Sequence, residues 1–372
     1  MYTSARRDSC LKQAVLATAF IALSRRYKSS ALYLTARTHY GAALRAVNLT
    51  LFSPSTIRQE ETLASLMLLG MIEDIDHHGP SAKSTHMLGI AKLCEVVGRR
   101  PLTRIEESSL DEWMFKELEL HSLVAGDYLD CLAIPNTSLD GKKPVTRVAV
   151  TVARIGQFCR DFKNSRPLQE SALEAKHLET LISIVEQATV VQHELSEIDS
   201  SVLPEWNHQN TTDERHADER GSQLPVHPSR WIATARSLFH VSSILFFTKF
   251  VSCCRTLLEL DQGTAYAYHP RHETKTSLTL AEAQLVRLIH MLCATMPYLM
   301  GEVDEQGNSV AVPVHKAVIM YHLIWPLAFV NASAWSTRQQ VQDARRRLDL
   351  IQEQYGIKLA SAAPEMARSI LD

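Results

Sequence analysis

A short acidic and histidine-rich stretch is the densest group of residues in this chain that could bind a metal or transfer a proton. It contains Glu73, Asp74, Asp76, His77 and His78. Residues three or four positions apart share one face of a helix, so both Glu73 and Asp74 would lie beside His77. Carboxylates and imidazoles bind divalent metals and also serve as general acids and bases. The catalytic candidates are therefore Glu73, Asp74, Asp76 and His77.

A metal centre at this stretch would need ligands from a second helix. Glu174 and His177 have the carboxylate-x-x-His spacing that di-iron helical bundles use. The acidic residues also resemble the aspartate-rich motif of all-α terpene cyclases, but no second metal motif follows downstream. We therefore interpret the stretch as the polar C-terminal turn of a buried helix, and we expect neither a metal nor a cofactor.

Linear catalytic motifs are absent from the sequence. It has no Gly-x-Ser-x-Gly elbow, phosphate-binding glycine loop, dinucleotide fingerprint or His-Glu-x-x-His pair. His86 and His322 lie in apolar helical patterns, where we expect core or boundary histidines rather than bases. A site assembled from distant residues leaves no linear trace. The absence of motifs favours a protein that is not an enzyme without excluding catalysis.

The candidate residues follow a helix that should lie at the centre of a helical domain. Residues 66–72 are apolar on every side, a pattern typical of a buried helix. Gly79 and Pro80 should break the chain after it. A further helix is expected from about Ala82 to Val97, closed by Gly98 at its C-cap.

Helical periodicity extends along the rest of the chain, and no run of residues reads as a strand. We predict an all-α fold, a single regulatory-type bundle of roughly ten to twelve helices over residues 1–372. Thr279 and Glu282 have the spacing of a capping box, and Gly356 should end a late amphipathic helix. The polar, aperiodic residues 199–229 predict a mobile loop.

Composition narrows the class of protein. The chain has 372 residues, 45% hydrophobic and 22% charged, with a formal net charge of -2. This balance gives no global basic surface for nucleic acid. The seven cysteines are scattered, mostly in apolar runs, which indicates reduced thiols inside the cell. No apolar run is long and clean enough to predict a membrane span.

Several segments, taken in order, resemble the helical regulatory region of fungal zinc binuclear cluster transcription factors, the fungal transcription factor domain. The order of these segments, more than any one of them, carries the resemblance, which extends over about residues 10–371. The segments are Tyr40–Asn48 with its Tyr-x-x-Ala-Leu pattern, Glu61–Glu73 with its leucine-rich centre, His86–Leu93 with His-x-x-Gly, Ile324–Leu327 and Leu350–Ile357.

The resemblance implies a transcription-regulator-like protein that acts in the nucleus, with the cytoplasm as the alternative location. Members of this family bind DNA through an N-terminal cysteine-rich zinc cluster, and no cysteine pattern here supplies one. We therefore do not expect this chain to bind DNA directly. It implies instead that the protein acts through other transcription regulators, a homodimer or a small ligand, and that it regulates a metabolic gene cluster of secondary metabolism.

Two alternatives stay open at the level of sequence. One is an enzyme on the same helical fold that converts a small apolar metabolite in a cavity between helices. It would require a pocket with convergent carboxylates or histidines. The other is a structural interaction module, which would show a large exposed apolar patch and no cavity.

Overall fold

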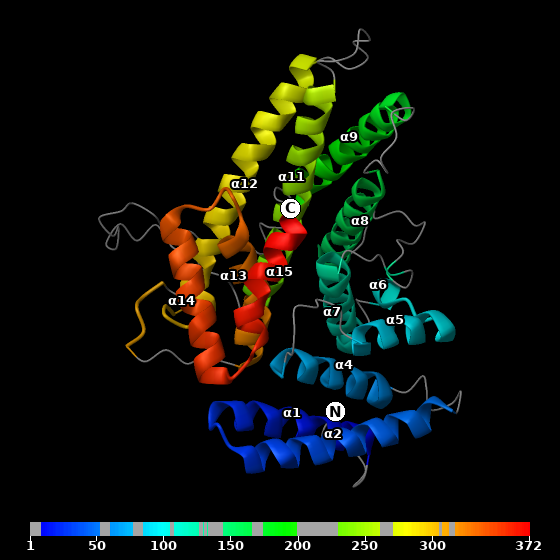
Figure 1. Ribbon diagram of the computed structural model, residues 1–372, viewed down its shortest axis with the longest axis vertical. Coiled ribbons are helices and arrows are strands. Elements are labelled where there is room, and N and C mark those ends of the chain that lie inside the picture. The colour runs from blue at the N-terminus through cyan, green and yellow to red at the C-terminus, as the bar shows by residue number, and fades with distance from the viewer. Residues whose placement is uncertain are drawn as a thin grey trace. The chain divides into compact units, whose positions relative to one another are not determined.

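The computed structural model describes residues 9–52, 60–76, 85–104, 108–125, 129, 132, 144–165, 174–198, 230–260, 271–304, 307–311 and 317–372 (Figure 1). Across these residues the regular structure is helical. The one β-type pairing among them is an isolated antiparallel bridge between Val303 and Ser309. The predicted all-α fold is confirmed. The predicted loop at 199–229 lies outside the described residues.

The chain divides into two compact units. Unit 1 comprises residues Met1–Thr146 together with Arg345–Ile370, and unit 2 comprises Arg147–Ala344 with the last two residues. This division does not test the predicted single domain over 1–372, which stays a prediction. In chain order the helices are α1 (Cys10–Arg26), α2 (Ser30–Leu51), α4 (Glu60–Ile75), α5 (Thr85–Val97), α6 (Pro101–Arg104), α7 (Ser109–Ala125), α8 (Pro144–Asn164), α9 (Glu174–Glu197), α11 (Arg230–Leu260), α12 (Arg271–Leu299), α13 (Ala317–Ala332), α14 (Arg338–Tyr355) and α15 (Leu359–Leu371).

Helix α4 forms the centre of unit 1. It packs against α1, α2, α5 and α7, which explains why its sequence is apolar on every side. Its buried residues include Leu63, Met67 and Leu69, none of which is exposed. A methyl group added at Gly70 would overlap the end of the Met87 side chain, so this glycine allows α5 to approach α4 closely.

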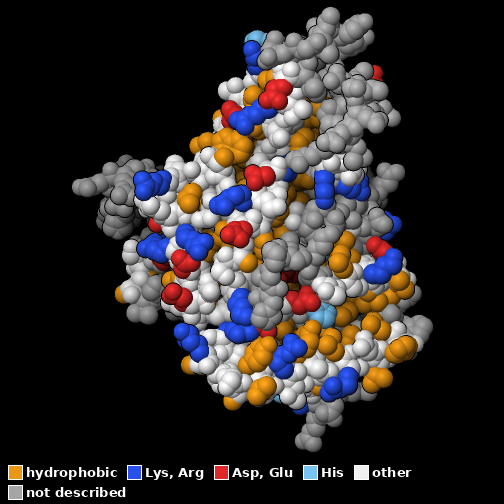
Figure 2. Space-filling view, in the orientation of Figure 1, with side chains coloured by type: hydrophobic (Ala, Val, Ile, Leu, Met, Phe, Trp, Pro, Cys, Tyr) orange, Lys and Arg blue, Asp and Glu red, His pale blue; other side chains and the backbone are white. Residues whose placement is uncertain are grey.

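Helix α2 is the least buried long helix of unit 1. Its buried side chains are Ala36, Ala43 and Val47, which lie on the face that packs against α1 and α4. Figure 2 shows hydrophobic side chains at the surface in the part of the view where α2, α4 and α5 lie. Unit 1 therefore has a well-packed centre and an apolar outer face.

The helix ends of unit 1 are closed by left-handed residues. After α5, Gly98 has φ 66° and the Arg99 amide donates to the Cys94 carbonyl at 2.8 Å, so the predicted C-cap is confirmed. After α1 the same arrangement uses Lys28, a non-glycine residue with φ 48°. The next amide, that of Ser29, donates to the Ser24 carbonyl at 3.0 Å.

Helix α11 is the central helix of unit 2. It packs against α9, α12 and α13, and its Phe246 contacts Phe158 of α8 edge to face with ring centroids 4.9 Å apart. Residues Ile232–Glu259 are long and apolar enough to cross a membrane. Within this segment, 83% of the 18-residue window used to judge its hydropathy is buried inside the protein. The burial favours a core helix.

One predicted helix start differs from the structure. Helix α12 begins at Arg271, so Thr279 and Glu282 lie inside it, and the predicted capping box there is wrong. The Thr279 hydroxyl instead donates to the Lys275 carbonyl one turn earlier, at 3.0 Å. The end of α14, in contrast, is as predicted: Gly356 follows it with φ 69°.

Candidate functional site

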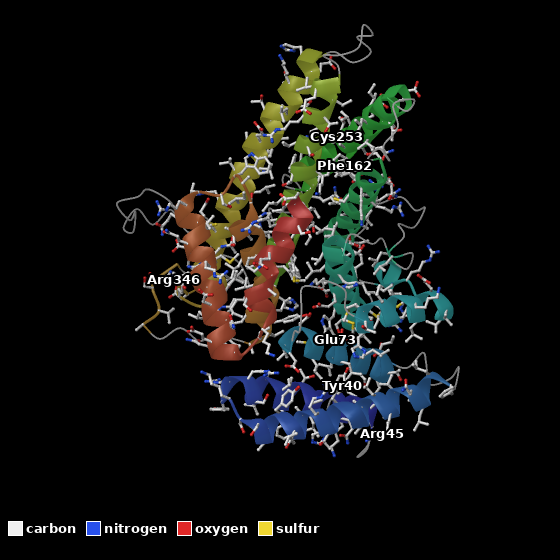
Figure 3. All side chains as sticks on the ribbon, in the orientation of Figure 1. Tyr40, Arg45, Glu73, Phe162, Cys253 and Arg346 are labelled. Atoms are coloured by element: carbon white, nitrogen blue, oxygen red, sulfur yellow. The ribbon has the colours of Figure 1, made fainter. Side chains whose placement is uncertain are left out.

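The predicted catalytic residues gather at the C-terminal end of α4. Glu73 and Asp74 lie in its last turn and Asp76 directly follows it, while His77 and His78 lie outside the described residues. Figure 3 shows Glu73 on α4 and Tyr40 on the neighbouring α2. The structure separates these acidic residues into two polar clusters with different partners.

The first group, the Asp76 cluster, consists of Arg25, Tyr33, Asp76 and Lys358. Arg25 Nη2 forms an ion pair with Asp76 Oδ1, and Lys358 Nζ lies 3.4 Å from the same oxygen. The Tyr33 hydroxyl donates to Oδ2 at 3.2 Å. Asp76 is only 6% exposed. With both oxygens engaged, this carboxylate stabilises the packing of helix ends, and its role as a base stays a prediction.

The charges of the Asp76 cluster are unequal. Two cations, Arg25 and Lys358, share one carboxylate, and the Arg25 guanidinium also lies over the Tyr33 ring, 5.0 Å from its centroid. Burial and, next, the positive charge of Arg25 lower the pKa of Lys358, while Tyr33 opposes the shift. The charged form of Lys358 is therefore disfavoured in this cluster.

The second group, the His86 cluster, consists of Tyr40 from α2, Glu73 from α4 and His86 from α5. The Tyr40 hydroxyl lies 2.9 Å from His86 Nε2, and Glu73 Oε1 lies 3.6 Å from the same nitrogen. Burial lowers the pKa of His86, and the Glu73 carboxylate partly opposes this shift. A neutral imidazole accepts from the tyrosine at Nε2, whereas a protonated one would donate toward Glu73.

Tyr40 is held in its protonated form at neutral pH. Burial and then the charge of Glu73 raise its pKa, and Arg37, whose guanidinium lies 5.1 Å from the centre of the Tyr40 ring, opposes them. The cluster brings three titratable side chains from three helices together. Among the described residues, however, no three His, Cys, Asp or Glu side chains lie close enough to hold a metal ion.

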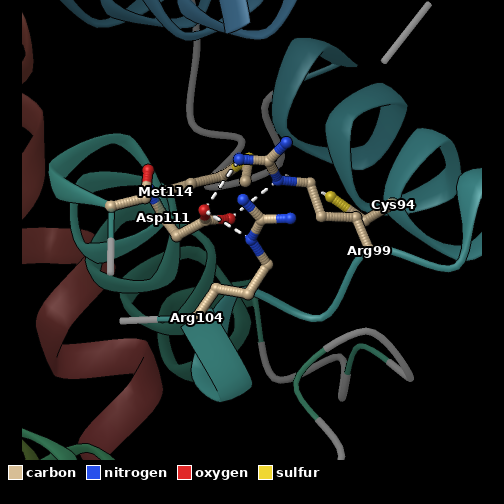
Figure 4. Close-up of polar contacts among 6 residues, drawn as sticks. Cys94, Arg99, Arg104, Asp111 and Met114 are labelled. Atoms are coloured by element: carbon tan, nitrogen blue, oxygen red, sulfur yellow. Dashed lines mark hydrogen bonds and ion pairs between the residues drawn. The ribbon is translucent and has the colours of Figure 1, made fainter. Parts of the chain in front are cut away.

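A buried, bidentate ion pair in unit 1 joins the segment after α5 to α7 and was not predicted from the sequence. Arg99 donates through Nε and Nη2 to the two oxygens of Asp111, both at 2.7 Å, and Arg104 Nε lies 3.3 Å from Oδ2 (Figure 4). The Asp111 side chain is fully buried. The sequence gives little indication of this pair, because an aspartate in the first turn of a helix is usually exposed to solvent and interacts with the helix dipole.

Glu119 is a second buried acid that sequence reasoning missed. It is 4% exposed, and its buried Oε1 has no hydrogen-bond partner among the residues that the structure describes. Burial raises the pKa of Glu119 to about 8. This carboxyl group is therefore mainly protonated at neutral pH.

The structure describes most of the cysteines but not the side chains of the alternative metal pair. The cysteines that the structure describes form no disulfide with one another, and burial raises the pKa of Cys253 and of Cys254 to about 12. Such thiols are poor nucleophiles at neutral pH. Glu174 and His177 lie in α9, but their side chains fall outside the described residues.

These observations define an all-α protein whose first unit packs around the apolar helix α4 and contains buried ion pairs and hydrogen-bonded clusters. Residues 1–135 match the family described as Fungal specific transcription factor domain, and this match confirms the resemblance over α1 to α7. The match suggests a transcription-regulator-like role. No curated protein and no solved structure matched the chain.

Proposed function

We propose that the protein is a transcription regulator that acts in the nucleus by binding other transcription regulators or a second copy of itself. The observation that carries this proposal is an apolar surface on α2 and α5, within the residues that match the fungal domain. We call this surface the α2–α5 face; it consists of Leu34, Leu49, Phe52, Leu88 and Val96.

The α2–α5 face exposes side chains that a monomeric protein usually buries. Leu49 is 74% exposed and Phe52 is 87% exposed, and Leu34 and Val96 are also largely in contact with solvent. Leu49 and Phe52 are three residues apart at the end of α2 and so lie on one face, while Leu34 lies in the first half of the same helix. Exposed apolar side chains on two helices that meet through Tyr40 and His86 support a protein interaction site.

Charged residues accompany the apolar side chains on α2. Arg37 and Arg45 are exposed on this helix, and Figure 3 shows Arg45 on its outer side. An apolar centre with charged residues around it is the usual anatomy of a protein interface. This arrangement supports a protein partner and gives no separate reason to assign DNA contact to the chain.

The proposal is tested by tethering the full chain to an unrelated DNA-binding domain upstream of a reporter gene. We expect the tethered chain to change reporter expression and Leu49→Glu to abolish the change. Leu280→Glu is the matched control, because Leu280 is 61% exposed but lies on α12 of unit 2. A reporter that does not respond to the tethered chain would overturn the proposal, as would equal effects of the two variants.

The identity of the partner needs a second measurement. Sedimentation of the purified chain distinguishes a homodimer, which Leu49→Glu should dissociate, from a monomer that awaits a different regulator. A fluorescent fusion of the full chain tests nuclear location. Transcript profiling after gene deletion tests the further proposal that the targets form a metabolic gene cluster, and native mass measurement tests for a bound small ligand.

A further inference from the structure

The turn that joins α14 to α15 docks onto helices from the opposite end of the chain. The Lys358 amide donates to the Ile75 carbonyl at the end of α4, at 3.2 Å. Its ammonium group lies 3.4 Å from Asp76, a residue 282 positions earlier. All of these residues belong to unit 1. The C-terminal residues are therefore part of the unit that contains the family-matched helices.

Gly356 packs directly against Arg25 and leaves no room for a side chain. It has φ 69°, and a Cβ atom there would overlap Arg25 Cβ and lie 2.9 Å from the Arg25 carbonyl carbon. A clash with backbone cannot be relieved by a rotamer change. Only glycine allows the turn to lie this close to the end of α1.

Charge also contributes to this contact, because Arg25 and Lys358 both face the Asp76 carboxylate. Asp76 is nearly buried, with 8% of its side chain exposed, whereas the Lys358 side chain is 32% exposed. Arg25 and Lys358 repel one another across the shared carboxylate. The Arg25 pair with Asp76 joins the ends of α1 and α4, which form the surface under the turn. The Gly356 contact and the Lys358 amide attach the turn to this surface, and the Lys358 ammonium group is the weaker attachment.

We propose that residues Tyr355–Lys358 form a latch that closes over the ends of α1 and α4 and can open locally while the core of α4 stays folded. When it is closed, the segment Arg345–Ile370 completes the unit that begins with the matched residues 1–135. The latch uses none of the residues of the α2–α5 face, so it stands independently of the proposed function.

Hydrogen exchange of the full-length chain, followed by mass spectrometry, tests the latch. In Gly356→Ala we expect exchange at least about tenfold faster in peptides that cover the ends of α1 and α4 and residues 351–362, because an undocked turn leaves these amides open. Peptides over residues 63–69 of α4 should keep the slow exchange of the unaltered chain. Gly98→Ala is the matched control: Gly98 has a similar φ of 66°, but a Cβ there meets nothing within 4 Å.

Two further variants keep the test decisive if Gly356→Ala does not fold. Asp76→Asn removes the shared carboxylate and should open the same peptides, whereas Lys358→Met removes the repelling cation and should leave them protected. The latch is overturned if Gly98→Ala accelerates exchange in these peptides as much as Gly356→Ala. It is also overturned if Asp76→Asn leaves them unchanged, or if residues 63–69 exchange as fast as the turn.

Discussion

Tyr40 and His86 come from different helices and meet through a 2.9 Å contact between the tyrosine hydroxyl and imidazole Nε2. The imidazole also faces the Glu73 carboxylate, at 3.6 Å. His86 Nε2 therefore accepts from Tyr40 when the imidazole is neutral and donates toward Glu73 when it is protonated. Helices α2, α4 and α5 share this proton-sensitive contact.

Changing Glu73 to glutamine should lower the pKa of His86 further. The carboxylate is the group that opposes the lowering by burial, and Glu73→Gln removes its charge while keeping its shape. Titration of the His86 ring protons by NMR in both proteins measures the shift directly. An unchanged or higher pKa in the variant would show that Glu73 does not act on this imidazole.

The lowered pKa of His86 makes the stability of the fold depend on pH. Because the folded state holds the proton of His86 less well than the unfolded state, stability should fall as the pH drops below about 6.5, the unperturbed pKa of histidine. His86→Gln should show a smaller loss between pH 7.5 and 5.5 in urea unfolding. Equal losses in the two proteins would exclude this contribution.

Removing Asp111 should be far more damaging than removing Arg104. Asp111→Asn leaves the buried Arg99 guanidinium without its bidentate partner, and loss of one member of a buried pair costs about 3–5 kcal/mol. Arg104→Gln removes a half-exposed cation and should cost less than about 1 kcal/mol. Urea denaturation of both variants measures the difference. Similar values would mean that solvent, and not Arg99, supports the Asp111 carboxylate.

The sequence predicts the helices of this protein better than its polar contacts. The apolar run in α4 and the C-caps at Gly98 and Gly356 are visible because period and glycine position are local signals. Thr279 and Glu282 formed an equally good capping box but lie inside α12, since the helix continues upstream to Arg271. A cap motif indicates a possible helix start and does not exclude continuation.

The polar clusters escaped prediction because their members are far apart in sequence. The sequence pattern marks Asp76 through its neighbours along the chain, whereas its structural partners include Arg25, Tyr33 and Lys358. The pattern predicts a core or boundary histidine at His86 but does not indicate Tyr40 and Glu73 as the groups near it. Only packing brings these residues together, and no local pattern records it.

Glu119 should destabilise the protein increasingly as the pH rises. Its pKa is about 8 in the folded state against a usual value of 4.5, so between these values the unfolded state releases a proton that the folded state keeps. Glu119→Gln avoids this cost and should be more stable than the unaltered protein by roughly 1–3 kcal/mol at pH 7.5. The advantage should shrink toward pH 5.

The pH profile separates this effect from a simple packing change. Unfolding free energies of Glu119→Gln and the unaltered protein at pH 5, 6.5 and 8 give the profile, with Glu365→Gln, an exposed change on α15, as the control. A constant difference at all three pH values would show that Glu119 has an unrecognised partner in the folded protein.

Replacing Lys28 with glycine should stabilise the turn between α1 and α2. Lys28 has φ 48°, a left-handed conformation that costs a residue with a Cβ about 1 kcal/mol and costs glycine little. The amide bonds of Lys28 to Arg25 and of Ser29 to Ser24 close the end of α1 through backbone atoms, so they are kept in the variant. We expect Lys28→Gly to raise the free energy of unfolding by about 0.5–1 kcal/mol in urea denaturation. Lys28→Ala keeps the left-handed strain and removes the same charge, so it should give no such gain; if it stabilised the protein equally, the effect would come from charge and not from backbone conformation.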